Sequence, residues 1–272
     1  MKESQTITSV HNPLVKRLCL LHERKGREEA GSFLVEGVHL VEEALLSGAA
    51  VVSVIYDGEK GIDPVCSRAL ERRSGEGIHL IAASPAVMAK LSETKSPQGI
   101  VAEVKKPQRD WNEMIRQLSS RDFLVLMLDG IQDPGNLGTI LRTAEAAGAD
   151  AVIIGKGTVD LYNGKVVRST MGALFRLPVF SCPLPEAAAQ LQSHGGELYV
   201  TSLGEGTERY DRLPYDGKIA IVIGNEARGV SREMLAVANR RVHIPLYGQA
   251  ESLNAAVAAG IMLYEAQRQR KR

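Results

Sequence analysis

Apolar runs alternate with polar, turn-forming stretches along most of the chain. In its first part, short apolar runs of strand length alternate with stretches in which apolar residues recur at helical spacing. The predicted strands are 33–35, 51–56, 79–81 and 99–104, and the predicted helices are 37–46, 64–73 and 85–91. Elements that alternate at this length predict a small α/β domain.

The second part of the chain has more strongly apolar runs. We predict strands at 123–128, 151–154, 198–201, 219–223 and 242–244, and helices at 111–118, 136–147, 184–192, 231–238 and 253–268. Strands this apolar are typical of a parallel sheet that is buried on both faces. The proline-containing stretch 105–110 is polar and suits a linker. The pattern therefore predicts a first domain at 1–104, a linker and first helix at 105–120, and a second domain at 121–272.

Composition narrows the class of protein. Hydrophobic residues make up 44% of the 272 residues and charged residues 24%, as in ordinary soluble domains. No apolar run could cross a bilayer, and Met1–Gln5 lacks the apolar core of a signal peptide, so we expect a cytoplasmic location. The three cysteines and six histidines show neither disulfide nor metal-ligand spacing, and we predict no metal site.

Basic residues cluster near the amino terminus although the net charge is only +1. The cluster is interleaved with leucines and valines, which predicts an amphipathic helix with one basic side. Its members are Lys16, Arg17, Arg24, Lys25 and Arg27. Such a stretch by itself is more often a solvated surface helix.

Three segments of the second part carry polar side chains just after apolar strands: Asp129–Arg142, Ile223–Gly229 and Ile244–Asn254. The carboxyl ends of parallel strands meet at one edge of a sheet, where ligands bind. In the first segment, Asp133 and Pro134 are typical of a helix start. Arg142 follows Gly138 by four residues, so its side chain can lean over that glycine toward the start of the helix.

The other two segments allow structural as well as functional interpretations. Gly224 would let a ligand approach the backbone, and Glu226 is either a turn residue or a partner that orients Arg142. Ser231 is expected to cap the following helix. A helix cap would also be a sufficient structural explanation of Ser252.

Taken together, the three segments resemble the signature motifs of the SpoU (TrmH-type) family of RNA ribose 2'-O-methyltransferases, within the SPOUT superfamily. The stretch Arg168–Val179 is similar to the family's sequence between its first two motifs, and Pro97–Ala102 resembles the end of an L30e-like substrate-binding domain. Ala255 and Ala256 depart from the Val and Ser that relatives often carry. The resemblance implies a parallel α/β domain with a deep trefoil knot, a homodimer, and S-adenosylmethionine as cofactor.

The resemblance also implies roles for individual residues. The implied catalytic residues are Asn136, Arg142, Glu226, Ser252 and Asn254; the implied cofactor-binding residues are Thr201, Ser202, Leu203, Gly204, Gly224, Asn225, Ile244, Leu246 and Leu253. The five basic residues near the amino terminus become candidates for RNA binding.

The expected reaction is methylation of a ribose 2'-hydroxyl in structured RNA, with ribosomal RNA favoured over transfer RNA. The family proposal makes Arg142 the base, but a guanidinium is not readily deprotonated. We therefore hypothesise that Arg142 chiefly anchors a neighbouring phosphate. A non-catalytic RNA-binding protein is the main alternative. A nucleotide-dependent oxidoreductase is disfavoured because no strand leads into Gly-x-Gly-x-x-Gly.

Overall fold

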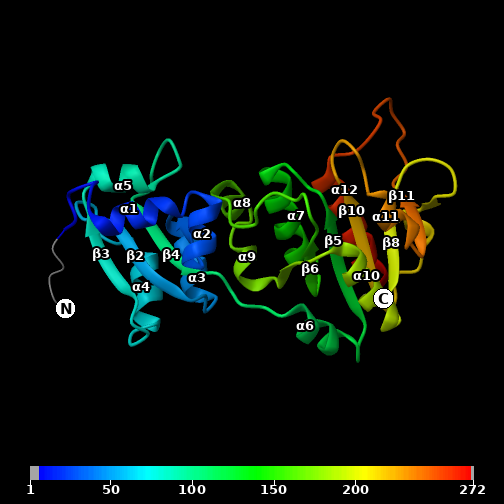
Figure 1. The fold of residues 1–272 in the computed structure, drawn as a ribbon, viewed down its shortest axis with the longest axis horizontal. Coiled ribbons are helices and arrows are strands. Elements are labelled where there is room, and N and C mark those ends of the chain that lie inside the picture. The colour runs from blue at the N-terminus through cyan, green and yellow to red at the C-terminus, as the bar shows by residue number, and fades with distance from the viewer. Residues whose placement is uncertain (1–5, 271–272) are drawn as a thin grey trace. The chain divides into compact units, whose positions relative to one another are not determined.

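The computed structural model describes residues 6–270, which form two compact units (Figure 1). The first unit comprises Met1–Gln108 and Asp160–Phe175, and the second comprises Arg109–Val159 and Arg176–Arg272. The division at Gln108 lies inside the predicted linker. The inclusion of Asp160–Phe175 in the first unit differs from the predicted continuous domain at 121–272. The expectation for Met1–Gln5 lies outside the described residues.

A four-stranded sheet forms the centre of the first unit, in the order β1-β4-β2-β3. Its strands are β1 (Ser32–Glu36), β2 (Val51–Asp57), β3 (His79–Ala83) and β4 (Ile100–Lys105). Strand β4 runs antiparallel to both β1 and β2, whereas β2 and β3 are parallel. The helices are α1 (Pro13–Leu20), α2 (Arg24–Ala30), α3 (Val38–Leu46), α4 (Pro64–Arg72), α5 (Pro85–Leu91), α8 (Gly164–Ser169) and most of α9 (Ala173–Arg176).

The predicted single basic helix near the amino terminus is wrong, because the chain breaks it into α1 and α2. Asn12 caps α1 by accepting a hydrogen bond from the backbone amide of Leu14. The two helices come close together at Gly26, which has no side chain. A Cβ at this position would lie 2.0 Å from the carbonyl oxygen of Leu20. The break changes the direction in which the basic side chains point.

A seven-stranded sheet forms the centre of the second unit, and all of its pairings are parallel, as predicted. Its order is β7-β6-β5-β10-β8-β11-β9. The strands are β5 (Phe123–Asp129), β6 (Ala151–Ile154), β7 (Val179–Ser181), β8 (Glu197–Thr201), β9 (Glu208–Arg209), β10 (Lys218–Gly224) and β11 (Arg240–His243). The short outer strands β7 and β9 were not predicted, since two or three residues leave no periodic signal.

Helices cover both faces of this sheet. Helices α6 (Trp111–Leu118), α10 (Leu184–Ser193) and α11 (Arg232–Ala236) share one apolar core with the strands. Helices α7 (Pro134–Ala146) and α12 (Ala255–Arg270) pack against each other, and α12 also contacts β10. A short 3-10 turn, η1, spans Tyr210–Arg212. Burial on both faces explains why the central strands are apolar at almost every position.

No helix within residues 6–270 is both long enough and apolar enough to cross a membrane. The described residues also contain no group of three or more His, Cys, Asp or Glu side chains that could hold a metal ion. All three cysteines are free.

Candidate active site

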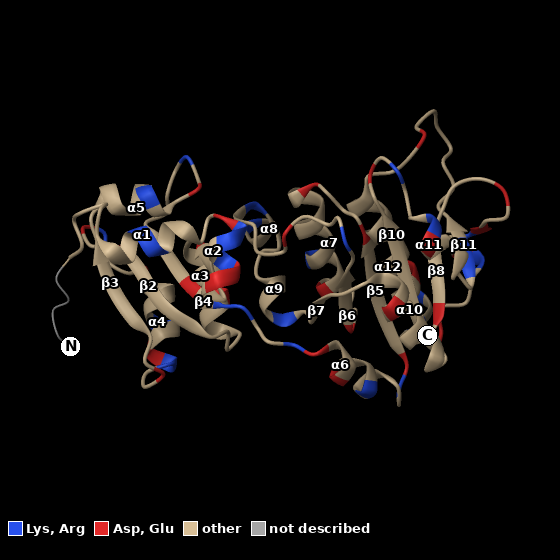
Figure 2. Cartoon of the chain, viewed as in Figure 1, with Lys and Arg blue, Asp and Glu red and all other residues tan. Residues whose placement is uncertain are grey.

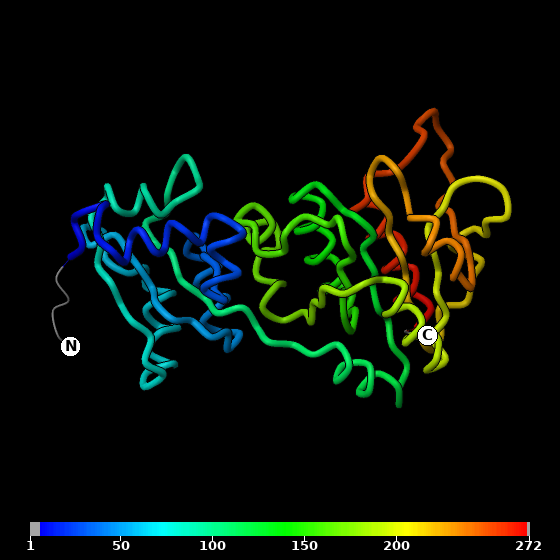
Figure 3. Tube along the Cα trace, in the orientation of Figure 1, coloured from blue at the N-terminus to red at the C-terminus, as the bar shows by residue number. Residues whose placement is uncertain are grey.

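Three loops leave the carboxyl ends of neighbouring parallel strands in the second unit. They follow β8, β10 and β11, and the loop after β5 lies beside them because β5 pairs with β10. Figure 3 shows the loops after β8, β10 and β11 leaving the same end of the sheet. The three predicted motifs therefore meet at one edge, as the parallel arrangement requires.

The loop after β5 is held in place before α7 begins. Gly130 adopts a φ of +74°, a conformation that favours glycine. Its carbonyl accepts a hydrogen bond of 2.7 Å from the side-chain amide of Asn225. The Asp133 carboxylate accepts from the backbone amide of Asn136 at 2.8 Å, and Pro134 occupies the first turn. The sequence thus starts α7 as predicted and fixes Asn136 beside the loop.

Glu226 is a hydrogen-bond acceptor for the loop after β5. Its carboxylate accepts from the backbone amides of Gln132 at 3.1 Å and Asp133 at 3.2 Å, and from Nδ2 of Asn136 at 3.0 Å. Burial raises the pKa of Glu226, but these hydrogen bonds outweigh it and the net shift is downward. Glu226 is therefore an anion at neutral pH. The hypothesis that Glu226 orients Arg142 is not supported, because the side chain that donates a hydrogen bond to its carboxylate is that of Asn136.

Asn254 extends this network to the loop after β11. Its Nδ2 donates to Oδ1 of Asn136 at 2.9 Å. Its own Oδ1 accepts from the backbone amides of Ala256 at 2.9 Å and Val257 at 3.3 Å, so Asn254 caps α12. A chain of side chains from Glu226 through Asn136 to Asn254 therefore joins the three predicted motifs.

Ser252 does not cap α12, which corrects the structural explanation offered for it. The helix begins at Ala255, and Asn254 provides the cap. Within residues 6–270 the exposed Ser252 hydroxyl forms no hydrogen bond. Its side chain is thus left available to a ligand.

Gly224 is required by the protein itself. A Cβ at this position would lie 2.3 Å from the backbone nitrogen of Val230 and 2.3 Å from the carbonyl carbon of Gly229. The absent side chain therefore lets the loop fold back on itself, a structural role in addition to the ligand approach that the sequence suggested. Asn225 stabilises the same turn, since its Oδ1 accepts from the backbone amides of Ala227 and Arg228.

Arg142 lies on α7 and is exposed. The described part of the chain provides no hydrogen bond or ion pair for its guanidinium. The same holds for Arg228, in the loop after β10. Two unpaired cations thus lie on the elements that carry the network of Asn136 and Glu226, where an anion could bind them.

A cavity of about 510 Å³ opens between the three loops. Its walls include Thr201, Ser202, Leu203, Gly224, Asn225, Glu226, Ile244, Leu246, Ser252 and Leu253, all of which the resemblance implied. Gly204 is not part of the wall, and neither are Asn136, Arg142 and Asn254.

The wall also contains residues that were not predicted. These are Ile223, Ala227, Arg228, Gly229, Val230, Leu235, Val242, His243, Glu251, Ala255 and Ala258. Five of them, Ile223, Leu235, Val242, Ala255 and Ala258, are apolar residues of strands or helices, whose sequence pattern indicates burial but not a cavity. The volume of the cavity, its apolar wall residues and the carboxylates of Glu226 and Glu251 suit a cationic ligand with an apolar body.

Figure 2 shows Lys and Arg positions along α1 and α2 in the first unit. The basic side chains near the amino terminus differ in how far they are already paired within the protein. Lys16 and Lys25 are exposed, and Lys25 lies 3.8 Å from Glu29. Arg24 pairs with Glu28 at 2.7 Å on the surface, and Arg17 donates two hydrogen bonds of 2.8 Å to the buried Glu103.

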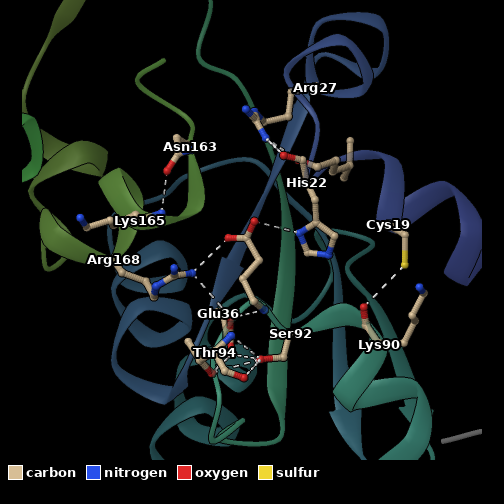
Figure 4. A network of polar contacts seen from close by, with 12 residues as sticks. Cys19, His22, Arg27, Glu36, Lys90, Ser92, Thr94, Asn163, Lys165 and Arg168 are labelled. Carbon is tan, nitrogen blue, oxygen red and sulfur yellow. Dashed lines mark hydrogen bonds and ion pairs between the residues drawn. The ribbon is translucent and has the colours of Figure 1, made fainter. Parts of the chain in front are cut away.

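Arg27 cannot contact RNA as predicted, because it is buried with only 3% of its surface exposed. Its guanidinium donates to Asp160 at 2.5 Å and to the backbone carbonyls of Leu21 and His22. Figure 4 shows Arg27 beside His22. Arg168, from the same inserted segment as Asp160, lies 3.2 Å from Glu93 and 3.7 Å from Glu36. These ion pairs hold residues 160–175 in the first unit.

Comparison with known proteins gives a consistent result. Residues 123–264 match the SpoU rRNA Methylase family, and residues 12–102 match the MRM3-like substrate binding domain. The 23S rRNA (guanosine(2553)-2'-O)-methyltransferase RlmP of Bacillus subtilis (strain 168) is 40% identical over 258 residues, covering 95% of this chain and 97% of that protein.

The chain is also similar to an enzyme from Streptomyces and to a crystal structure that contains the bound cofactor. The 23S rRNA (uridine(2479)-2'-O)-methyltransferase of Streptomyces viridochromogenes is 33% identical, covering 98% of this chain and 93% of that protein. The crystal structure of the SpoU methyltransferase AviRb from Streptomyces viridochromogenes, in complex with AdoMet, superimposes with a TM-score of 0.84 at 33% identity. The superposition covers 95% of this chain and 98% of that one.

Proposed function

The chain belongs to the SpoU rRNA methylase family, and we propose that it transfers the methyl group of S-adenosylmethionine to a ribose 2'-hydroxyl of ribosomal RNA. The observation that carries this proposal is the network from Glu226 through Asn136 to Asn254, which lies beside a ligand-sized cavity. A protein that only bound RNA would have no use for this combination of cavity and polar network.

The cavity residues fit the cofactor. S-adenosylmethionine supplies an electrophilic methyl group on a sulfonium cation. The apolar walls, including Ile244, Leu246 and Leu253, would bind its adenosine and methionine carbons. The carboxylates of Glu226 and Glu251 would favour this positively charged cofactor over a neutral ligand.

The site residues would act mainly by positioning. Holding the hydroxyl in line with the methyl group supplies several kcal/mol of the barrier reduction. Glu226 fixes Asn136, and Asn136 is in turn held by Asn254, so these amides are preorganised. The unpaired Ser252 hydroxyl would contact substrate or cofactor.

Arg142 would bind the phosphate next to the target ribose. A guanidinium stays protonated at neutral pH and is suited to bidentate phosphate contacts. The bound phosphate could then accept the proton that leaves the hydroxyl. Arg142 would thereby serve the reaction without being deprotonated itself.

The relatives support 23S ribosomal RNA as substrate, with a guanosine as the first target to test, since RlmP modifies a guanosine and is 40% identical. We assign substrate binding to the first unit, which matches a substrate-binding domain. Lys16 and Lys25 are its best candidates for RNA contact among the basic residues near the amino terminus, because they are exposed and their ammonium groups form no hydrogen bond within residues 6–270. Activity on ribosomal RNA would place the protein in the cytoplasm.

We also propose that the second unit forms a homodimer and contains the family's trefoil knot. The exposed Val257 and Tyr264 on α12, at 51% and 55% exposure, support a dimer contact on that helix. The knot is supported by the family membership and by the way the loops after β8, β10 and β11 share one cavity.

The proposal is tested with the purified protein, labelled S-adenosylmethionine and 23S rRNA from cells that lack the gene. Calorimetry first measures cofactor binding, and nuclease digestion with mass spectrometry then identifies any methylated nucleoside. A 2'-O-methylnucleoside is expected. Cofactor binding without transfer to 23S rRNA would reject this substrate, and absence of cofactor binding would reject the enzymatic function.

A further inference from the structure

Tyr247 is the most exposed of the large hydrophobic side chains in residues 6–270, at 85% of its surface. It belongs to the loop between β11 and α12, which projects beyond the ends of the strands (Figure 1). Aromatic side chains are usually buried because they carry much apolar surface. Among the aromatic residues at positions 6–270, Tyr264 is the next most exposed, at 55%.

The position of Tyr247 distinguishes it from a random surface tyrosine. Its neighbours Leu246 and Ile244 line the cavity, as do Ser252 and Leu253 at the other end of the same loop. Tyr247 does not line the cavity itself. The loop therefore turns its inner residues toward the cofactor site and leaves the tyrosine ring on its outer side.

This arrangement indicates what kind of molecule could use the ring. Tyr247 is not among the wall residues that a cofactor inside the cavity would contact, and no Phe, Tyr or Trp within residues 6–270 lines the cavity. RNA must approach the loops from outside for its ribose to reach the methyl group. Proteins that recognise RNA bases commonly stack them on aromatic side chains, which accept any base by its flat face.

The surroundings of the ring suit a nucleotide. The cavity wall beside the loop carries the unpaired guanidinium of Arg228, which can bind a phosphate. The phenol of Tyr247 also lies close enough to Arg209 to contribute to raising the pKa of that guanidinium, after the larger effect of Asp211. Arg209 is itself paired with Asp211 at 2.8 Å, so Arg228 is the cation left for a phosphate. An aromatic face with a cation nearby is a common combination for single-stranded RNA.

We infer that Tyr247 is a positioning residue that stacks on an unpaired base of the RNA substrate, at or next to the nucleotide whose ribose is methylated. The inference rests on the proposed function and specifies how the substrate is held there. Stacking fixes the nucleotide relative to the loop that carries Ser252. It requires an aromatic ring and not merely an apolar side chain.

The test compares Tyr247→Ala, Tyr247→Leu, Tyr247→Phe and Tyr247→Trp in methyl transfer to 23S rRNA. Loss of one stacked base corresponds to a rise of roughly 5- to 140-fold in the KM for RNA. We expect that rise for the Ala and Leu variants, and values within about twofold of the wild type for the Phe and Trp variants. Cofactor affinity, measured by calorimetry, should not change. A Leu variant as active as the wild type would overturn the inference.

Two further measurements separate the alternatives. Stacking should quench the fluorescence of Tyr247→Trp when RNA is added, against the background of the buried Trp111. Unchanged fluorescence at saturating RNA would contradict the inference even if the wild type methylates RNA.

Sedimentation tests a second copy of the chain as the occupant, and a change of association state in Tyr247→Ala would overturn RNA stacking. If the wild type transfers no methyl group, the proposed function fails, whereas the fluorescence titration still reports on stacking.

Discussion

Two arginines of the first unit, Arg27 and Arg168, and two of the second, Arg142 and Arg228, are used in opposite ways. In the first unit, Arg27 and Arg168 form ion pairs with Asp160, Glu36 and Glu93, so their charges are satisfied inside the protein. In the second unit, Arg142 and Arg228 are exposed and have no partner among the described residues. The difference separates charges that hold the fold from charges that are free to bind a ligand.

This contrast explains why a basic residue type alone does not identify an RNA contact. Arg27 and Arg142 are both arginines in or near a predicted motif, yet burial and pairing give them different roles. A buried ion pair is costly to break on one side only, because the remaining charge stays poorly solvated. An exposed unpaired arginine costs the fold little when it is removed.

The largest expected effect is on the rate, for Arg142→Ala. If its guanidinium anchors the phosphate beside the reacting ribose, turnover should fall about 10²- to 10³-fold while cofactor affinity and stability stay unchanged. Methyl-transfer kinetics, calorimetry and thermal unfolding measure the three quantities. Arg232→Ala, an exposed arginine on α11, is the matched control and should keep full activity.

RNA affinity distinguishes the two roles of Arg142. A phosphate anchor predicts weaker RNA binding together with the lost rate. Lost rate with unchanged RNA affinity would contradict an anchoring role and favour direct participation in proton transfer.

The opposite behaviour is expected for Arg27→Ala. Removing the buried partner of Asp160 should lower the free energy of unfolding of the first unit by about 3 to 5 kcal/mol. Hydrogen exchange of peptides from α2 and residues 160–175 measures the loss locally. Arg24→Ala is the control, because Arg24 pairs with Glu28 on the surface and should contribute less than about 1 kcal/mol. Equal effects of the two substitutions would abolish the contrast between the units.

A moderate effect is expected for Glu226→Gln. The substituted amide would direct N–H groups toward a site where donors already point, so it would misplace Asn136. Hydrogen bonds to a charged group contribute about 1.5 to 3 kcal/mol, which corresponds to a loss of activity of at least about tenfold. Glu233→Gln on α11 serves as the control in the same methyl-transfer assay. Full activity of Glu226→Gln would mean that the network does not position the reacting groups.

The smallest effect concerns pH. Burial raises the pKa of Glu103, but the hydrogen bonds and charge of Arg17 outweigh it and the net shift is downward. A carboxyl with a lowered pKa stabilises the fold above its unfolded pKa of about 4.3, and this stabilisation is lost as the pH falls through the folded value. Arg17→Ala should raise the pKa of Glu103, so that the first unit loses stability at a less acidic pH.

The carbon-13 shift of the Glu103 carboxyl, followed against pH, checks this prediction. Lys16→Ala on the same helix is the control, since Lys16 has no role in holding Glu103. An unchanged titration midpoint in Arg17→Ala would show that the ion pair does not determine the pKa.

Much of the second unit could be predicted from the sequence because its signals are local. Strands such as 123–128 are apolar at every position, and parallel pairing then brings the following loops together. Asp133 and Pro134 start α7 by interactions within four residues. The family resemblance added the cofactor and the reaction, and the match over residues 123–264 confirms the family.

What could not be predicted depends on partners far apart in the chain. Arg27 is buried because Asp160, 133 residues later, lies against it. The role of Asn254 as helix cap, with Ser252 left free, depended on where α12 begins, and such boundaries are poorly defined by local pattern. The position of Tyr247 outside the cavity likewise follows from the path of its loop.

The central claim is that this site methylates ribose and not a base, and alkaline hydrolysis of the labelled product tests it most directly. A 2'-O-methyl group blocks cleavage of the adjoining phosphodiester bond, so label on ribose remains in alkali-resistant dinucleotides. We predict that label transferred to 23S rRNA by the wild-type protein is found there, and that Arg142→Ala transfers almost none. Label released entirely in mononucleotides would contradict the account, since the methyl group would then be on a base.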